Sequence, residues 1–153
     1  MLSFTLPDGD EYHLQHLCLD LNGTIALDGR LVEGAAERLA AIRDHLEIHL
    51  LTAGTHGGVP EVERALGVQA TSIHGGEEKE AFVASLGPQG VVAIGNGRND
   101  AAMLALARLG ICVVGPEGAA REAVMAADVV APSPQAALSL LLHPDRLRAT
   151  LRR

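Results

Sequence analysis

Short apolar runs alternate along the chain with segments whose apolar residues recur every third or fourth position. The runs predict strands at 17–21, 48–51, 91–94, 111–114 and 129–130, with a weaker candidate at 68–73. The segments between them predict helices at about 34–44, 59–66, 77–86, 99–109, 119–126 and 135–142. Nearly continuous apolar strands are typical of parallel strands buried between two layers of helices. Because the connections are short, the pattern predicts an α/β fold with a three-layer, Rossmann-like parallel sheet.

Two Asp-Gly pairs predict hairpins outside this alternation. Asp8-Gly9 lies between strand-forming stretches at 3–5 and 12–14, and Asp28-Gly29 lies between 25–27 and 30–32. The second pair predicts a β-hairpin flap just after the first long strand. No internal repeat or linker interrupts the pattern, so we expect one domain over residues 1–153. For the arginine-rich tail at 144–153 we expect a solvated or surface-packed segment, with a subunit or partner contact as the alternative.

Composition and charge argue against nucleic acid and membranes as binding partners. Aromatic residues make up only 2% of the chain, which argues against a base-stacking platform for single-stranded nucleic acid. The net charge of −7 argues against binding to nucleic acid or to an anionic membrane. The sequence has no signal-peptide pattern and no apolar run that would span a bilayer, so we expect a cytoplasmic protein. Cys18 and Cys112 lie in apolar runs and are expected to be reduced core residues.

Candidate chemical groups come directly after the predicted strands. In an open α/β sheet the ligand crevice lies beyond the carboxyl ends of the strands. Asp20 and Asn22 come after the first long strand, Thr52 and Ala53 after the second, and the segment 95–100 after the strand at 91–94. Lys79 lies in the first turn of a predicted helix. Each residue alone is more simply a cap, a turn former or a solvated side chain, but the pattern predicts that they converge at one edge of the sheet.

Such a set suits a phosphoryl-transfer site. A carboxylate such as Asp20 can accept a phosphoryl group, and Mg²⁺ takes oxygen ligands of the kind that Asp20 and the segment 96–100 offer. The Thr52 hydroxyl and the Lys79 ammonium would hold the phosphate oxygens. Catalysis of this kind is mostly positioning and charge neutralisation.

Four motifs in order resemble the haloacid dehalogenase-like (HAD) superfamily of phosphatases and phosphoryl-transfer domains. DLNGT, from Asp20, looks like its first motif; LLTAGT, which contains Thr52, looks like its second; Lys79 suits the third; and GNGRNDAAML, from Gly95, looks like the fourth. The motifs cover 17–114, and the first and fourth are the specific ones. The forms DLNGT and GNGRND are similar to those of soluble proteins likened to the phosphorylation domain of P-type ATPases, a resemblance that extends over the whole chain.

The resemblance implies a role for each position. Asp20 would be the nucleophile that becomes phosphorylated, and the backbone carbonyl of Asn22 would be an Mg²⁺ ligand. Thr52, with its neighbour Ala53, and Lys79 would bind the phosphoryl group. A further pair, Asn96 and Asp100, would complete or support the metal site.

Two asparagines depart from the family pattern. The family's phosphatases usually carry, in place of Asn22, an Asp that serves as general acid and base, and an amide does neither. General acid–base help contributes about 10²–10⁴-fold, so a phosphatase with Asn22 should be slow. Asn96 replaces another usual Asp and should weaken the Mg²⁺ site. The function predicted is a slow Mg²⁺-dependent phosphatase or phospho-accepting domain that acts through an aspartyl phosphate.

The spacing of the motifs leaves no room for a cap domain. Only a hairpin and a helix fit between Thr24 and Thr52, and only a helix and a strand fit between Thr52 and Lys79. By the resemblance, an open site acts on large phosphorylated substrates or is closed by a neighbouring subunit, which is compatible with a homo-oligomer. Gly57 and Gly58, beside His56, predict a mobile loop near Thr52.

Three functions from other classes remain. The first is a catalytically degraded domain that binds phosphate, metal or a protein partner, which Asn22 and Asn96 motivate. The second is a receiver-type signalling domain, but the acidic pair expected just after its first strand is missing. The third is a dinucleotide-binding oxidoreductase, but the Gly95-x-Gly97 segment lacks the third glycine of the fingerprint.

Overall fold

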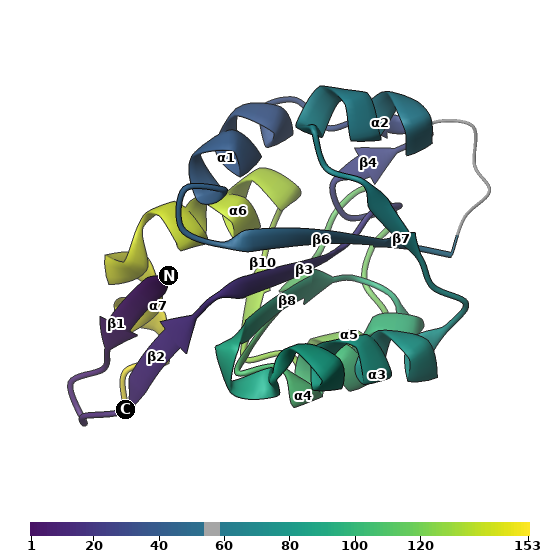
Figure 1. Cartoon of the computed structure of the whole chain (residues 1–153). Coiled ribbons are helices and arrows are strands. Elements are labelled where there is room, and N and C mark those ends of the chain that lie inside the picture. Colours follow the sequence, from purple (N-terminus) through teal and green to yellow (C-terminus); the bar gives the residue numbers. More distant parts are fainter. Residues whose placement is uncertain (54–58) are drawn as a thin grey trace.

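A computed structural model of the chain describes residues 1–53 and 59–153. Its centre is a six-stranded, fully parallel sheet in the order β10-β9-β8-β3-β6-β7 (Figure 1). The strands are β3 (His16–Asp20), β6 (Glu47–Thr52), β7 (Ala70–Ser72), β8 (Val91–Gly95), β9 (Leu109–Val113) and β10 (Val129–Ala131). The predicted three-layer, Rossmann-like sheet is confirmed, including the weak candidate that became β7.

Helices cover both faces of the sheet. Helices α1 (Ala35–Ile42), α2 (Val59–Leu66) and α6 (Pro134–Leu142) lie on one face, and α3 (Gly76–Leu86), α4 (Ala101–Leu106) and α5 (Arg121–Ala126) lie on the other (Figure 1). Successive side chains of β3 point to opposite faces of the sheet. Leu17 and Leu19 therefore pack in the core under α1, α2 and α6, and Cys18 packs in the core under α3, α4 and α5. Both predicted core cysteines, Cys18 and Cys112, are buried and free.

Both predicted hairpins are present. Strands β1 (Leu2–Thr5) and β2 (Glu11–Leu14) form the first hairpin, and β4 (Ala26–Leu27) and β5 (Arg30–Leu31) form the flap. The flap turns at Asp28 and Gly29, whose φ angles are 51° and 80°. Asp and Gly tolerate such left-handed angles better than most residues, which is why this pair specifies the turn.

Two elements differ from the sequence-based expectation. The predicted helix at 99–109 becomes a short 3₁₀ helix (Arg98–Asp100), then α4, and β9 already begins at Leu109. The chain turns tightly from α4 into β9, since a Cβ on Gly110 would lie 2.3 Å from the carbonyl oxygen of Leu104.

The tail at 144–153 is the second difference. It is not simply solvated, because it forms helix α7 (Pro144–Leu151), which packs against β1. Pro144 suits the first turn of a helix, and Leu147 is fully buried. Arg153 reaches Asp8 in the β1–β2 hairpin at 2.7 Å. Surface packing is therefore the part of the expectation that holds.

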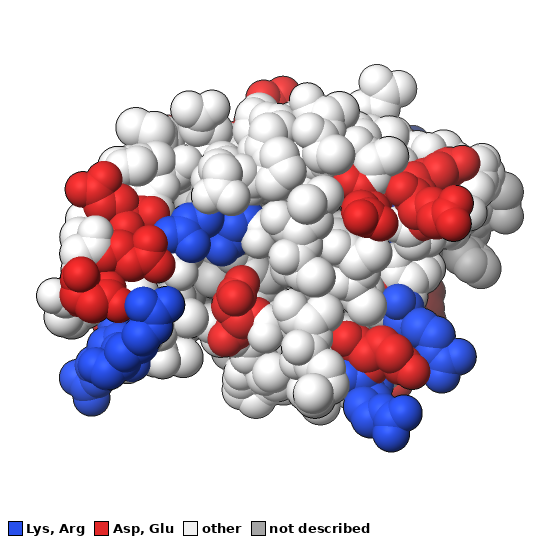
Figure 2. All heavy atoms as spheres, turned by 90° about the horizontal axis from the view of Figure 1, so that it is seen from below, with Lys and Arg blue, Asp and Glu red and all other residues white. Residues whose placement is uncertain are grey.

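The surface seen in Figure 2 mixes charges of both signs. Acidic and basic side chains lie side by side at the two ends of this face, and its middle is mostly uncharged. The described part of this face therefore presents no broad basic field of the kind that attracts nucleic acid. Among the described residues, no helix is both long enough and apolar enough to cross a bilayer.

Candidate active site

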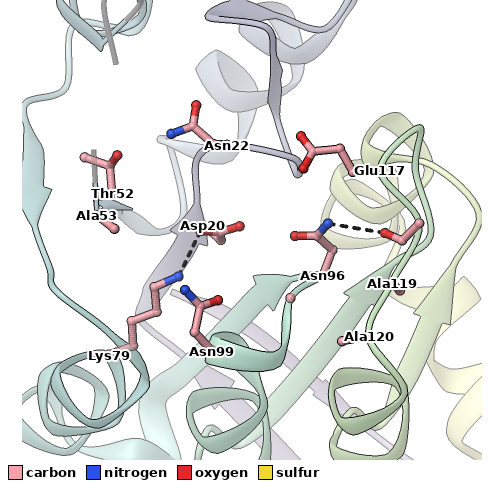
Figure 3. Close-up of a pocket in the computed structure, with 12 residues that line it drawn as sticks. Asp20, Asn22, Thr52, Ala53, Lys79, Asn96, Asn99, Glu117, Ala119 and Ala120 are labelled. Atoms are coloured by element: carbon pink, nitrogen blue, oxygen red, sulfur yellow. Dashed lines mark hydrogen bonds and ion pairs between the residues drawn. The ribbon is translucent and has the colours of Figure 1, made fainter. Parts of the chain in front are cut away.

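The predicted site residues meet at the carboxyl edge of the sheet. Asp20 ends β3, Thr52 ends β6, and Asn96 comes directly after β8. Helices continue from β3 and β8 to opposite faces of the sheet, so the crevice between these two strands is where an α/β sheet binds ligands. A pocket of about 470 Å³ opens there. All the predicted site residues except Asp100 line it, namely Asp20, Asn22, Thr52, Ala53, Lys79 and Asn96 (Figure 3).

Lys79 is the centre of the ionic network. It is the only lysine of the chain, and its side chain is 1% exposed. Its Nζ lies 2.9 Å from Oδ1 of Asp20 and 2.6 Å from Oδ1 of Asp100. Burial alone would lower the pKa of the Lys79 ammonium, but the two carboxylates outweigh burial and raise it. The group is therefore a fixed positive charge that faces the end of β3.

Asp20 is a carboxylate held at both oxygens. Besides the contact of Oδ1 with Lys79, Oδ2 accepts a hydrogen bond from the Thr24 hydroxyl at 3.1 Å. Burial, helped by the nearby charge of Asp100, raises the pKa of Asp20 to about 7, although Lys79 and Thr24 act in the opposite direction. The negative charge of Asp20 is thus costly in this buried position, and a bound cation would favour the ionised form.

Asp100 lies behind the pocket rather than in its wall. It is fully buried, and its Oδ2 accepts the backbone N–H groups of Asn96 at 3.0 Å and Gly97 at 2.9 Å. Its other oxygen is the one that Lys79 contacts. The close approach requires Gly95, because a Cβ there would lie 2.5 Å from the carboxyl carbon of Asp100. Asp100 therefore fixes both Lys79 and the loop after β8, and its direct ligation of a metal stays a prediction.

The oxygens that face the pocket fit a hard cation. The Asn96 amide donates from Nδ2 to the carbonyl oxygen of Gly118 at 3.2 Å, which orients its own Oδ1 to the other side. That Oδ1 and Oδ2 of Asp20 both contact the same hydroxyl, Thr24 Oγ1, at 3.4 and 3.1 Å. An amide oxygen and a carboxylate oxygen on one side of the pocket are the kind of ligand that Mg²⁺ takes.

The sequence-based prediction missed residues after β9. Glu117, Gly118, Ala119 and Ala120 line the pocket, as does Asn99 of the fourth motif. Figure 3 shows the Glu117 side chain beside the chain that leaves Asn22. A Cβ on Gly23 would lie 3.0 Å from the Glu117 carboxyl group, so the bare Gly23 makes room for it. By a strand-end rule we mean the expectation that site residues follow the carboxyl ends of the parallel strands. Applied to the predicted strand at 111–114, this rule would have found Glu117 three residues beyond the end of the strand.

The walls of the pocket are short. Between Thr24 and Thr52 the structure has only the flap, α1 and β6, and between Thr52 and Lys79 it has α2, β7 and the start of α3 among the described residues. No cap domain is present in these described segments, as the spacing predicted. The end of the second motif, at Gly54 and Thr55, and the loop predicted at 56–58 lie outside the described residues.

Two proteins of Methanocaldococcus jannaschii are similar in sequence. The uncharacterised protein MJ0073 is 48% identical over 62 residues, which are 40% of this chain and 67% of that protein. The uncharacterised protein MJ0072 is 51% identical over 39 residues, which are 26% of this chain and 89% of that protein. No family model matches the sequence.

Solved structures identify the fold. A protein of Streptomyces avermitilis assigned to the HAD family of hydrolases superposes with a TM-score of 0.68 at 23% identity and covers 86% of this chain and 87% of its own. The 3-deoxy-D-manno-octulosonate 8-phosphate phosphatase of Moraxella catarrhalis, solved with magnesium and phosphate ions, gives 0.69 at 17% identity, with 92% and 94% coverage. A zinc-transporting P-type ATPase gives 0.65 at 24% identity over 78% of this chain and 20% of its own. At these identities the likeness shows the fold, which is HAD-like.

Proposed function

Because the chain belongs to one family with the two M. jannaschii proteins and has the HAD-like fold, we propose that it is an Mg²⁺-dependent phosphatase that acts through a phosphorylated Asp20. One observation carries the proposal. The only lysine of the chain is buried between Asp20 and Asp100 at the carboxyl edge of the sheet, where Thr52 also ends its strand. Burying an ammonium between two carboxylates costs desolvation energy. A role in binding the phosphoryl group would explain why the chain keeps a charge in this position.

In this proposal Asp20 attacks the phosphorus of a phosphate monoester. The bond between phosphorus and the Asp20 oxygen forms as the ester P–O bond breaks, and the leaving oxygen takes up a proton from water or from a neighbouring acid. Water then attacks the phosphorus, the bond to Asp20 breaks, and phosphate leaves. Lys79 and Thr52 hold the non-bridging oxygens, which keeps the phosphorus in line with Asp20.

The metal would be held by Asp20, the backbone carbonyl of Asn22 and Oδ1 of Asn96, with Asp100 in support. Bound Mg²⁺ would neutralise charge on the phosphate and on Asp20. A relative of the fold, the phosphatase of M. catarrhalis, was solved with magnesium and phosphate ions, which supports this choice of metal. Phosphate release from a panel of phosphate monoesters should therefore stop when the protein is stripped with EDTA and return with Mg²⁺. Release that continues unchanged after chelation would contradict the metal-dependent mechanism.

Turnover should be slow, because Asn22 neither donates nor accepts the protons that the two steps move. Asn22→Asp should raise the rate of phosphate release by at least about tenfold, within the 10²–10⁴-fold that general acid–base groups contribute. The matched control is Asn99→Asp, which adds the same charge to the same pocket from another wall. Equal rates for Asn22→Asp and the unaltered protein would mean that proton transfer at this position does not limit turnover.

We further infer that Glu117 supplies part of the missing proton transfer. Besides Asp20, it is the one carboxylate among the described residues that line the pocket. Glu117→Gln keeps the shape of the side chain and should lower phosphate release by about 10-fold or more, while Glu117→Asp should keep part of the rate. If Glu117→Gln releases phosphate as fast as the unaltered protein, water alone serves this step.

A phospho-accepting module that does not turn over is the second candidate. Asn22 and Asn96 both remove negative charge from the surroundings of a bound phosphate, which favours a long-lived phosphoenzyme or simple binding. Beryllofluoride binding with Mg²⁺ but without phosphate release would favour this module. If the protein neither binds beryllofluoride nor releases phosphate, only a protein-interaction role is left.

The open pocket bears on the size of the substrate and on whether a second subunit takes part. Without a cap in the described segments, large phosphorylated substrates can reach Asp20, or a second subunit can cover it. We propose that residues 1–153 act as one domain in the cytoplasm. Light scattering on the purified protein tests the predicted homo-oligomer, and a monomer would remove subunit closure from the proposal.

A further inference from the structure

A second cluster of potential ligands lies at the opposite edge of the sheet. His16 begins β3 and Glu47 begins β6, and the two are direct neighbours in the parallel register. His49 lies two residues further along β6, so its side chain faces the same side of the sheet as Glu47. Asp20 stands at the other end of β3, about 13 Å away at about 3.3 Å per residue. The cluster therefore does not share the pocket described above.

The ligand atoms of the cluster are already close together. Nδ1 of His16 lies 3.1 Å from Nε2 of His49 and 3.4 Å from Oε2 of Glu47. One ligand atom from each of the three residues lies within 4.8 Å of the other two. A tetrahedral zinc-type ion with bonds of about 2.0–2.2 Å keeps neighbouring ligand atoms about 3.3–3.6 Å apart. Small side-chain movements would bring all three atoms into this geometry.

One proton on Nδ1 of His16 has to serve two close neighbours, His49 and Glu47. Nδ1 of a neutral imidazole carries either a proton or a lone pair. If Nδ1 of His16 accepts a hydrogen bond from Nε2 of His49, it has no proton to donate to Glu47; if Nδ1 carries the proton, it shares that proton between Glu47 and His49. A cation in the middle would be attractive to all three groups at once.

We propose that His16, Glu47 and His49 bind a divalent transition-metal ion of the zinc type. Two imidazoles and one carboxylate suit Zn²⁺ or Co²⁺, whereas Mg²⁺ and Ca²⁺ prefer oxygen ligands alone. The site is open to solvent on one side, since the Glu47 side chain is 68% exposed and that of His16 is 18% exposed. On the other side the ring of Phe82 from α3 packs edge-on against His49, with 5.3 Å between ring centres, and holds its orientation. Water would complete the coordination, and the bound ion would join β3 to β6.

The test uses the chain of residues 1–153 without an affinity tag, titrated with Co²⁺ in an excess of Mg²⁺ and followed by the visible absorption of the bound ion. The unaltered protein should bind one Co²⁺, which Zn²⁺ displaces. Asp20→Ala should bind it equally well. His49→Ala and Glu47→Gln should weaken binding by at least about 10-fold, the loss that removal of even an outer-shell partner can cause. The control is His13→Ala, because His13 is exposed and also contacts a carboxylate, Glu11 at 3.1 Å.

The second readout is thermal unfolding. Zn²⁺ should raise the unfolding midpoint of the unaltered protein and of Asp20→Ala, because it binds the folded state, and it should raise that of Glu47→Gln much less. Glu47 is exposed, so this variant should fold even if His49→Ala does not. The proposal is overturned if Co²⁺ does not bind, if Glu47→Gln and His49→Ala bind as tightly as the unaltered protein, or if Asp20→Ala loses the ion. These outcomes are independent of phosphate release.

Discussion

Asp20→Ala should reduce phosphate release to the rate of the buffer alone, a loss of at least about 10³-fold, because it removes the atom that forms the covalent bond to phosphorus. Asp20→Asn should have the same effect, since an amide has nearly the same shape but is a very weak nucleophile. Release is measured in excess Mg²⁺ on the best ester of the panel. Asp44→Ala is the control, because Asp44 is an exposed carboxylate outside the pocket. Unchanged release by Asp20→Ala would end the proposed mechanism.

The same variants should separate catalysis from stability. In the metal-free protein the pKa of Asp20 is raised from 3.8 to about 7 by burial and by Asp100. Between these values the folded state holds a proton that the unfolded chain has released, so the free energy of unfolding should fall as pH rises from about 4 to about 7. Asp20→Asn should remove this part of the pH dependence, and urea unfolding at several pH values measures it. An inactive Asp20→Asn that is at least as stable as the unaltered protein at pH 7 would show that activity was not lost through misfolding.

The strand-end rule explains why much of the site was predictable. Asp20, Thr52 and Asn96 stand at the ends of parallel strands that lie side by side, and in a parallel sheet such ends meet at one edge whatever the details of packing. The apolar runs that specify these strands are strong because the strands are buried on both faces. The position of Thr52 beside Asp20 can therefore be predicted from pattern alone.

Other features depend on packing that a pattern does not specify. The approach of Asp100 to Lys79 requires the missing Cβ of Gly95 and the way that α3 packs against α4. Helix α7 was missed because its polar, arginine-rich sequence has one buried anchor, Leu147, and the helix packs against β1 and α6, which are distant or separate elements that the local pattern does not bring together. The His16–His49 contact joins residues of two strands, and it depends on a register that no single segment encodes.

Lys79→Met should lower both activity and stability. The substitution keeps a side chain of similar length but removes its positive charge, which leaves Asp20 and Asp100 facing each other in a buried site. Removing one partner of a buried ion pair typically costs about 3–5 kcal/mol of the free energy of unfolding. Phosphate release should also fall to background, because the pocket loses its fixed cation. The control, Arg64→Met, breaks an exposed pair with Glu61 and should change stability by no more than about 0.5 kcal/mol.

A second substitution tests whether repulsion between carboxylates is the cause. In Lys79→Met/Asp100→Asn the remaining carboxylate no longer faces a second charge, so the double variant should recover part of the stability that Lys79→Met loses. Asp100→Asn alone should be destabilised, since it weakens the contacts to the backbone N–H groups of Asn96 and Gly97. The stability loss of the double variant should therefore be smaller than the sum of the two single losses, a coupling that urea unfolding resolves. Additive losses would mean that Lys79 and Asp100 stabilise the fold independently of each other, and the assignment of Lys79 as the cation that joins the two carboxylates would then be wrong.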